Sequence, residues 1–289
     1  MKKLKQLIEF LIIVFIFKVL NYFPINIVSS LGGKLFKFIG PLTNSHKTAI
    51  LNYKTIFNNL SDNKIKKDII ESWDNLGKTF IEFAILNKIL DTKNNRIKII
   101  GIDNLKKIKN NNEQVIFFSI HQANWELLVP TIDNFGISVG AIYRHINNPY
   151  INKYILKKRK TTLTNNGTFY TPKGKESAKE ILQAINNKLS MILLIDQKDS
   201  SGSNVSFFNL NAKTQIGFLK IARKYNLKLI PIQILREKIN NFSIIFHSPV
   251  DIFKKNKSDI EAMIKIHKII EKWIISNPTQ WFWQHNRFN

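Results

Sequence analysis

The chain has 289 residues, a length that fits one large α/β domain preceded by helices. Hydrophobic residues make up 44% of it, with 11 Gly and 8 Pro, so a sizeable core is available and collagen-like or wholly disordered structure is excluded. The absence of Cys excludes disulfides, thiolate metal sites, iron–sulfur clusters and a cysteine nucleophile.

Positive charge is the strongest signal of the composition. The 44 Lys and Arg against 20 Asp and Glu give a net charge of +24, which favours anionic partners such as nucleic acid, an anionic membrane or an acidic protein. Only six of these basic residues are Arg, the side chain used for bidentate contacts with bases and phosphates. We therefore expect no nucleic-acid partner, and a codon bias toward Lys, Asn and Ile is an alternative source of much of the excess.

The first predicted element covers residues 1–23, where a basic start precedes the apolar stretch 10–17. The residues after this stretch do not form a small-residue cleavage site, so we expect the segment to be retained. It is about long enough to cross a membrane, although Glu9 and Lys18 lie within it. Residues 1–24 are therefore predicted to anchor the chain to a membrane, as a marginal span or as an interfacial helix. An ordinary buried helix is the alternative.

The spacing of apolar residues predicts helices from residue 25 to about residue 90, and short β-rich runs alternating with helices after residue 94. The predicted strands are 97–100, 115–120, 137–143, 191–195, 227–235 and 242–246. The predicted helices among and after them are 125–134, 152–162, 175–187, 215–225 and 258–276. Two Asn/Lys-rich stretches, 106–113 and 254–258, predict solvated loops.

This alternation predicts an α/β fold with a mixed central sheet and helices on both faces, preceded by the membrane-anchoring helix and a helical segment. The expected domains are the anchor, 1–24, and one globular domain, 25–289. Within the second domain, we expect a helical part over 25–93 and an α/β core over 94–289.

The clearest candidate for chemistry follows the predicted strand 115–120. His121 stands at its carboxyl end and Glu126 at the start of the next helix, where open α/β sheets place their ligands. Five residues along one continuous helix would turn the two side chains about 140° apart. His121 therefore has to lie in the turn before the helix if its imidazole is to fold back on Glu126. A carboxylate on one ring nitrogen would raise the basicity of the other, as hydroxyl activation requires.

Further blocks follow this histidine-x4-glutamate motif. They are Tyr143-Arg144-His-Ile-Asn147-Asn148-Pro149, then Arg159, Asp196-Gln197-Lys198, the stretch 205–214 and the aromatic block 278–288. Taken together, they resemble the lipid A biosynthesis lauroyl/myristoyl acyltransferase family, the late acyltransferases of lipopolysaccharide assembly. The similarity extends from the apolar N-terminal helix to the last residue, whereas the histidine-x4-acid motif alone would reach only the wider glycerolipid acyltransferases.

The resemblance implies a transfer of a fatty acyl group from acyl carrier protein to a hydroxyl of a Kdo-lipid IVA type precursor of lipid A, at the cytoplasmic face of the inner membrane. Residues 25–289 would then be the acyltransferase domain, with His121 as general base and Glu126 as its orienting partner. Arg144, Arg159 and Asp196 are the expected substrate-binding residues. The two arginines suit phosphate groups, with a solvated surface position as the alternative. Asp196 is alternatively a structural hydrogen-bond acceptor.

An acyl thioester is already activated, so the reaction needs a base and a stabilised oxyanion, and we expect no cofactor. The six His are scattered along the sequence, so we expect no metal cluster. The implied partners are acyl carrier protein, an anionic glycolipid acceptor and a membrane.

Two other functions stay open at this stage. One is acyl transfer to another glycolipid or to a lysophospholipid by the same chemistry. The other is non-catalytic binding of anionic membrane or nucleic acid through the lysines. In the terminal block, Trp281, Phe282, Trp283 and His285 either line an acyl-binding or membrane-facing surface or complete the core.

Overall fold

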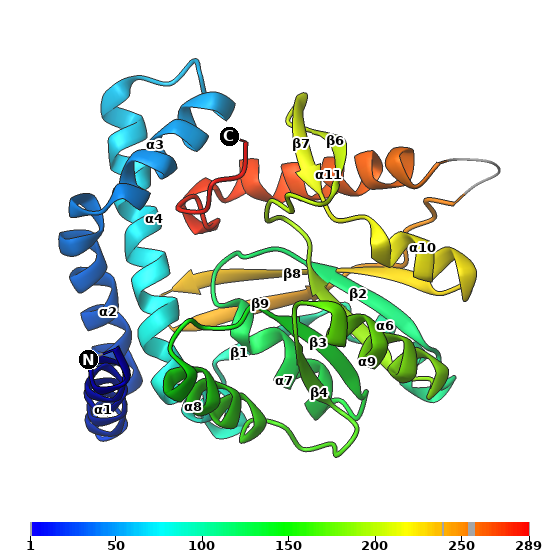
Figure 1. Cartoon of the computed structure of the whole chain (residues 1–289), viewed down its shortest axis with the longest axis horizontal. Helices are drawn as coiled ribbons and strands as arrows, with labels where there is room; N and C mark the ends of the chain where they lie inside the picture. Colours follow the sequence, from blue (N-terminus) through cyan, green and yellow to red (C-terminus); the bar gives the residue numbers. More distant parts are fainter. Residues whose placement is uncertain (1, 239, 254–257, 289) are drawn as a thin grey trace.

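The computed structural model describes residues 2–238, 240–253 and 258–288. An all-helical part comes first and stands along one side of the α/β part (Figure 1). Its α-helices are α1 (Lys2–Leu20), α2 (Ile25–Ile39), α3 (Asn44–Ile56), α4 (Asp62–Glu82) and α5 (Leu86–Leu90), with short 3₁₀ turns at Gly40–Leu42, Phe83–Ile85 and Thr92–Asn94.

Helices α2 and α4 approach closely because two glycines face each other. A Cβ on Gly32 would lie 2.6 Å from the carbonyl oxygen of Gly77, and a Cβ on Gly77 would lie 2.2 Å from that of Gly32. Any side chain at either position would push the helices apart. The chain enters α4 through Ser61, whose side chain accepts a hydrogen bond from the amide of Lys64. Helix α4 ends at Glu82, beside the first strands of the α/β part.

The main sheet has seven strands in the order β1-β9-β8-β2-β5-β3-β4. Their bounds are β1 Ile97–Ile100, β2 Val115–Ser119, β3 Val139–Tyr143, β4 Phe169–Pro172, β5 Ser190–Leu194, β8 Lys228–Lys238 and β9 Asn241–Phe246. Only β8 and β9 pair antiparallel, and every other neighbouring pair is parallel. The carboxyl ends of β2, β5, β3 and β4 therefore meet at one edge of the sheet.

Successive side chains of β2 enter two different cores. Ile116 and Phe118 pack among residues of α3, α4, α9, α10 and α11, whereas Val115 and Phe117 pack with residues of α5, α6 and α7. A strand whose side chains are apolar on both faces has to be covered on both faces. The covering helices are α6 Ile102–Asn110, α7 Leu128–Asn134, α8 Pro149–Lys160, α9 Lys175–Asn186, α10 Gly217–Lys224 and α11 Asp259–Ser276.

The predicted α/β fold with a mixed sheet is confirmed, and each of the six predicted strands lies within two or three residues of an observed one. Three strands were not predicted: β4 and the separate hairpin of β6 (Ser203–Phe207) and β7 (Leu210–Thr214). These segments are rich in polar residues and do not form an apolar run.

The expected loop 106–113 is wrong in its first half, because α6 extends to Asn110. Residues 254–257 of the other expected loop lie outside the described residues.

Helix α1 lies against the protein with one face and leaves the other face exposed. Phe10 packs against Tyr150 and Tyr154 of α8, with ring centroids 6.0 Å apart in both pairs. Phe17 packs against Phe83 at 6.2 Å. Within the described part of the chain, no helix combines the length and the apolar character that crossing a bilayer requires. The anchoring role of residues 1–24 stays a prediction, as does the division into two domains.

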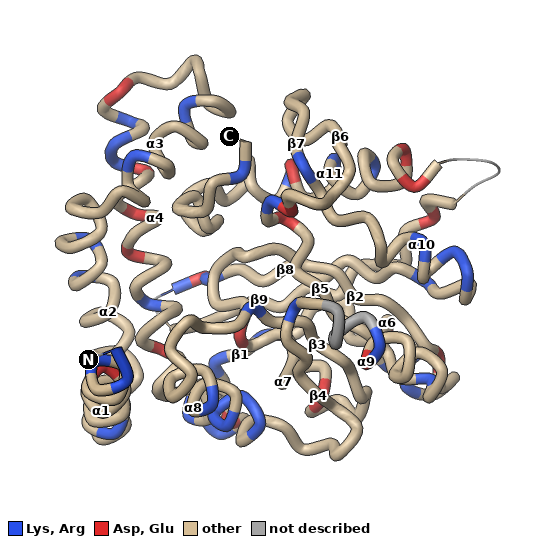
Figure 2. Tube along the Cα trace, viewed as in Figure 1, with Lys and Arg blue, Asp and Glu red and all other residues tan. Residues whose placement is uncertain are grey.

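Lys and Arg are spread over the helical part and the α/β part, including α3, α8 and α10 (Figure 2). The last turn of α8 alone carries Lys157, Lys158, Arg159 and Lys160. Charge by itself therefore singles out no face of the molecule as a binding surface.

Candidate active site

The site lies where the carboxyl ends of β2, β5 and β3 meet. Ser119 of β2 pairs with Leu194 of β5 in the parallel register. His121 and Asp196 each follow these paired residues by two positions, so the register brings them side by side. Arg144 directly follows β3, the next strand in the sheet. This edge is where open α/β sheets bind their ligands.

Asp196 holds His121 through two hydrogen bonds. The imidazole Nδ1 lies 2.8 Å from Oδ1 of Asp196, and the backbone amide of His121 donates to Oδ2 at 3.0 Å. The indole of Trp281 donates to the same Oδ2 at 2.7 Å. Asp196 is only 2% exposed. Burial would raise the pKa of its carboxyl, but the charge and hydrogen bonds of His121, with the bond from Trp281, outweigh burial and hold that pKa below its usual range.

An ionised Asp196 fixes the tautomer of the imidazole. The carboxylate accepts the hydrogen bond of Nδ1–H, which leaves the lone pair on Nε2. Nε2 lies 3.3 Å from the side-chain nitrogen of Gln197. The His121 ring lies beside two aromatic rings that stack on each other, with centroid distances of 5.1 Å to Trp125 and 6.2 Å to Phe282. This geometry suits a general base whose free nitrogen faces a partly apolar space.

Glu126 has a different partner from the one expected. Its carboxylate is bound in a bidentate manner by Arg159, with Nε to Oε2 at 2.8 Å and a terminal nitrogen to Oε1 at 2.6 Å. Both residues are described by the structure, and none of their contacts joins Glu126 to the imidazole of His121. The expected contact is therefore not observed. Physically, Asp196 reaches Nδ1 from the adjacent strand, while the turn after His121 carries Glu126 toward α8.

The Arg159–Glu126 pair is buried among aromatic rings. The guanidinium carbon of Arg159 lies 5.8 Å from the ring of Phe83, 5.7 Å from Tyr143 and 5.7 Å from Tyr170. Burial lowers the pKa of Arg159, but the charge of Glu126 outweighs it and raises that pKa. Burial and the same carboxylate also raise the pKa of Tyr170. The pair therefore places a fixed positive charge, largely compensated, in the wall of the site.

A cavity of about 1060 Å³ opens beside His121. This volume is at the upper end of the range of about 300–1,000 Å³ typical of small-molecule sites. Its wall carries the polar side chains of His121, Glu126, Arg144, Arg159, Lys173, Gln197, Lys198 and His285. Apolar residues of several helices and of strands β2, β3 and β5 also line it, among them Phe17, Ile116, Val129, Ile142, Ile155, Leu182, Met191 and Ile221. Such a wall fits a ligand with one long apolar part and one anionic part.

A scan of protein families matches the whole chain, residues 1–289, to the bacterial lipid A biosynthesis acyltransferases. The chain belongs to this family. A search of curated proteins finds no match. Among solved structures, the chain is similar to the 1-acyl-sn-glycerophosphate (LPA) acyltransferase PlsC from Thermotoga maritima, with 16% sequence identity and a TM-score of 0.40, over 96% of this chain and 98% of that one. This likeness is too distant to assign an activity.

Family membership makes the chain a lipid A type acyltransferase and favours the enzyme over the non-catalytic alternative. Of the five predicted site residues, the structure brings His121, Glu126, Arg144 and Arg159 to the cavity wall. Asp196 lies behind His121 and is not part of that wall. Asp196 accepts hydrogen bonds from His121 and Trp281, and its contact with substrate stays a prediction.

The C-terminal block of this acyltransferase takes both of its alternative roles. Trp281 and Trp283 are buried in the core, whereas Phe282 faces the cavity. The block also pairs with the loop that follows β2, because the amide of Phe282 donates to the carbonyl of His121 at 3.0 Å. A second bond, from the amide of Ala123 to the carbonyl of Gln280, measures 3.0 Å.

Sequence reasoning missed Gln197 as part of the site, and it considered Trp281 and His285 only as residues of a surface or of the core. His285 accepts a hydrogen bond from the amide of Lys198 at 3.0 Å, and burial, opposed by Asp196, lowers its pKa to about 4. The signal for Gln197 was its place directly after Asp196. For the other two residues, more than 80 positions separate them from their partners in the sequence. Among the described residues, no group of three or more His, Asp and Glu side chains is arranged to hold a metal ion.

Proposed function

We propose that this acyltransferase transfers a fatty acyl group from the thioester of acyl carrier protein to a hydroxyl of a Kdo-lipid IVA type precursor. The observation that carries the proposal is the imidazole of His121, held by the buried carboxylate of Asp196 and facing a large apolar cavity. In the runner-up hypothesis, the acceptor is another glycolipid or a lysophospholipid, and the chemistry is the same.

In the proposed reaction, Nε2 of His121 takes the proton of the acceptor hydroxyl as the hydroxyl oxygen attacks the thioester carbonyl carbon. The carbon–oxygen bond forms, and a tetrahedral oxyanion results. The carbon–sulfur bond then breaks, and the leaving thiolate takes the proton back from the imidazolium. Asp196 stays ionised throughout and stabilises that imidazolium, as the third member of a catalytic triad does. No covalent acyl-enzyme is formed.

The other polar residues of the wall suit binding and orientation of the substrates. Arg144 is exposed at the cavity and is proposed to contact a phosphate of the acceptor. Arg159 is proposed to assist from deeper in the wall, since Glu126 occupies its Nε and one terminal nitrogen. Glu126 is thereby proposed to act indirectly, by holding Arg159 in position for the substrate. The net charge of +24 suits both an anionic acceptor and an acidic carrier protein.

The proposed location is the cytoplasmic side of the inner membrane, with α1 and α2 docked on the lipid surface. More than half of the large apolar side chains that are exposed in the described residues belong to the first 42 positions. They include Leu11, Phe15, Leu35 and Phe38. Helix α1 also keeps Glu9 on its protein side, where Asn148 donates to it at 3.0 Å. A helix with one packed and one bare apolar face suits an interfacial position rather than a span.

Vesicle binding tests the proposed docking. The double variant Phe15→Gln/Phe38→Gln is expected to bind anionic phospholipid vesicles at least tenfold more weakly in a sedimentation assay, because each Phe contributes about 1.5–3 kcal/mol on burial. The matched control is Ile275→Gln, which removes an apolar side chain with 53% exposure on α11. Equal binding by the double variant and the control would contradict docking through these helices.

The activity itself is tested with purified protein and acyl carrier protein thioesters, offered Kdo-lipid IVA or lysophosphatidic acid as acceptor. Product mass spectrometry is expected to detect transfer to the lipid A precursor, and His121→Ala is expected to abolish it while circular dichroism and vesicle binding stay unchanged. Transfer to lysophosphatidic acid alone would favour the runner-up. Full activity of His121→Ala would refute the proposed base.

A further inference from the structure

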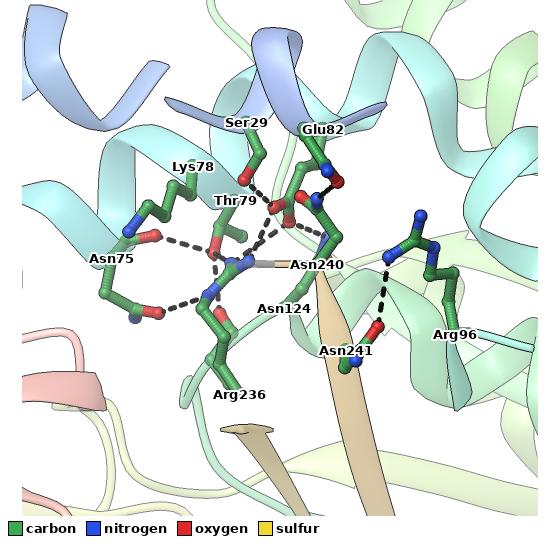
Figure 3. A network of polar contacts seen from close by, with 12 residues as sticks. Ser29, Asn75, Lys78, Thr79, Glu82, Arg96, Asn124, Arg236, Asn240 and Asn241 are labelled. Carbon is green, nitrogen blue, oxygen red and sulfur yellow. Dashed lines mark hydrogen bonds and ion pairs between the residues drawn. The ribbon is translucent and has the colours of Figure 1, made fainter. Parts of the chain in front are cut away.

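The catalytic loop, residues 120–126, carries the proposed base His121, and a second buried carboxylate binds it. Glu82, the last residue of α4, has a fully buried side chain and forms an ion pair with Arg236 of β8, whose side chain is 7% exposed. The two terminal nitrogens of Arg236 lie 2.5 Å and 3.0 Å from the two carboxylate oxygens (Figure 3). Neither residue lines the cavity.

The carboxylate of Glu82 also binds the catalytic loop directly. The side-chain amide of Asn124 donates to Oε2 at 2.8 Å, and the hydroxyl of Ser29, from α2, donates to Oε1 at 2.5 Å (Figure 3). Asn124 lies between His121 and Glu126 in the sequence and is fully buried. Glu82 therefore joins an N-terminal helix, a strand of the sheet and the loop that carries the proposed base.

The same network holds the residue before Asn124. Thr79 donates to the carbonyl oxygen of Ala123 at 2.7 Å and accepts from Arg236 at 3.1 Å. On the other side, the amide of Ala123 donates to the carbonyl of Gln280 at 3.0 Å. The side chain of Gln280 in turn bonds both backbone groups of Arg236, at 2.9 Å and 3.0 Å.

Ala123 needs such support because its backbone is in the left-handed region, with φ of 48°. A side chain with a Cβ is disfavoured there, and alanine has no polar group to compensate locally. Conformations of this kind persist when the surroundings fix them from several directions. The turn at Ala123 separates His121, which faces Asp196, from Trp125 and Glu126, which face the cavity.

We infer that Glu82 and Arg236 are positioning residues, which fix the turn at Ala123 and Asn124 and so set His121, Trp125 and Glu126 around the reacting groups. A buried ion pair by itself adds little to the free energy of unfolding, because desolvation offsets the attraction. Here, however, the ion pair is also hydrogen-bonded to groups that hold the loop. Asn124 donates to Glu82, and Arg236 donates to Thr79, which in turn binds Ala123.

Two variants separate positioning from stability. Asn124→Ala and Ser29→Ala each remove one donor to the Glu82 carboxylate and leave the ion pair with Arg236 in place. Only Asn124 belongs to the loop. We expect the two variants to lower Tm by similar amounts. Asn124→Ala is expected to lower kcat about 30-fold with KM within twofold of the wild type, and Ser29→Ala to keep kcat within twofold.

Hydrogen exchange supplies a second readout, since the kinetic one rests on the proposed acyl transfer. Amides of the peptide 120–127 are expected to exchange at least tenfold faster in Asn124→Ala, whereas those of α11 stay unchanged. Ser29→Ala is expected to leave both peptides as in the wild type. Exchange in Asn124→Ala that matches the wild type, or equal losses of kcat in the two variants, would overturn the inference. If the wild type transfers no acyl group to either acceptor, the exchange result still decides whether the Glu82 network holds the loop.

Discussion

Two buried carboxylates contact the loop between β2 and α7, and they differ in where their partners lie. Asp196 binds the imidazole of His121, which lines the cavity. Glu82 binds the guanidinium of Arg236, and neither of these two residues lines the cavity. Similar burial therefore accompanies two proposed roles: Asp196 supports the imidazole that faces the substrates, and Glu82 supports the turn that follows it.

The largest effect is expected when Asp196, the first of the two carboxylates, is replaced. Asp196→Asn keeps the shape of the side chain, but its amide group would face Nδ1 and favour the wrong tautomer of His121. We expect kcat to fall about 10³-fold or more, by analogy with the same change in serine-protease triads. Steady-state kinetics with the acyl carrier protein thioester measures this.

The matched control is Asp133→Asn, which alters another fully buried carboxylate, bound by the backbone and side chain of Thr164 and absent from the cavity wall. That variant is expected to lower Tm while each folded molecule keeps its activity. Should Asp196→Asn behave in the same way as this control, the role of Asp196 would be purely structural.

The second effect concerns Glu126, which binds Arg159 and not the imidazole. Glu126→Gln leaves the positive charge of Arg159 uncompensated in a largely buried position, so we expect loss of activity of about 10- to 100-fold, smaller than that of Asp196→Asn. The kinetic constants of both variants give the ranking. As a control, Asp259→Asn removes the carboxylate from the ion pair with Arg223 on α10 and is expected to keep full activity. A greater loss in Glu126→Gln than in Asp196→Asn would reverse the assigned roles.

The smallest effect concerns a buried histidine outside the site. Burial, partly opposed by a hydrogen bond to the carbonyl of Ser206, lowers the pKa of His267 to about 4. An unfolded histidine titrates near pH 6.5, so the unfolded state takes up a proton first and stability falls as the pH drops from about 6.5 toward 4. Between pH 7 and pH 5 the loss is about 2 kcal/mol for this one group.

Denaturant unfolding at the two pH values measures this contribution. His267→Gln is expected to be less stable than the wild type at pH 7 and to lose about 2 kcal/mol less on going to pH 5. The exposed His145 gives the control, since His145→Gln is expected to keep the pH dependence of the wild type. An unchanged pH dependence in His267→Gln would show that this imidazole does not titrate as described.

Local sequence patterns were sufficient for much of the fold. The six apolar runs became strands of the main sheet, since a run that is apolar on both faces can be buried only inside a covered sheet. The polar hairpin β6–β7 and strand β4 lacked that pattern and were missed. The place of His121 after a buried strand also marked the site, because this position follows from chain order and from the rule for open sheets.

The sequence by itself determined that this is a basic, cysteine-free α/β protein with His121 at the carboxyl end of a central strand. Only the tertiary structure decided which carboxylate serves that imidazole. Glu126 is nearer in sequence, but Asp196, 75 residues away, is brought beside His121 by the parallel pairing of β2 and β5. Strand register and the direction of a turn depend on contacts made across the whole fold, so spacing along the chain cannot reveal them.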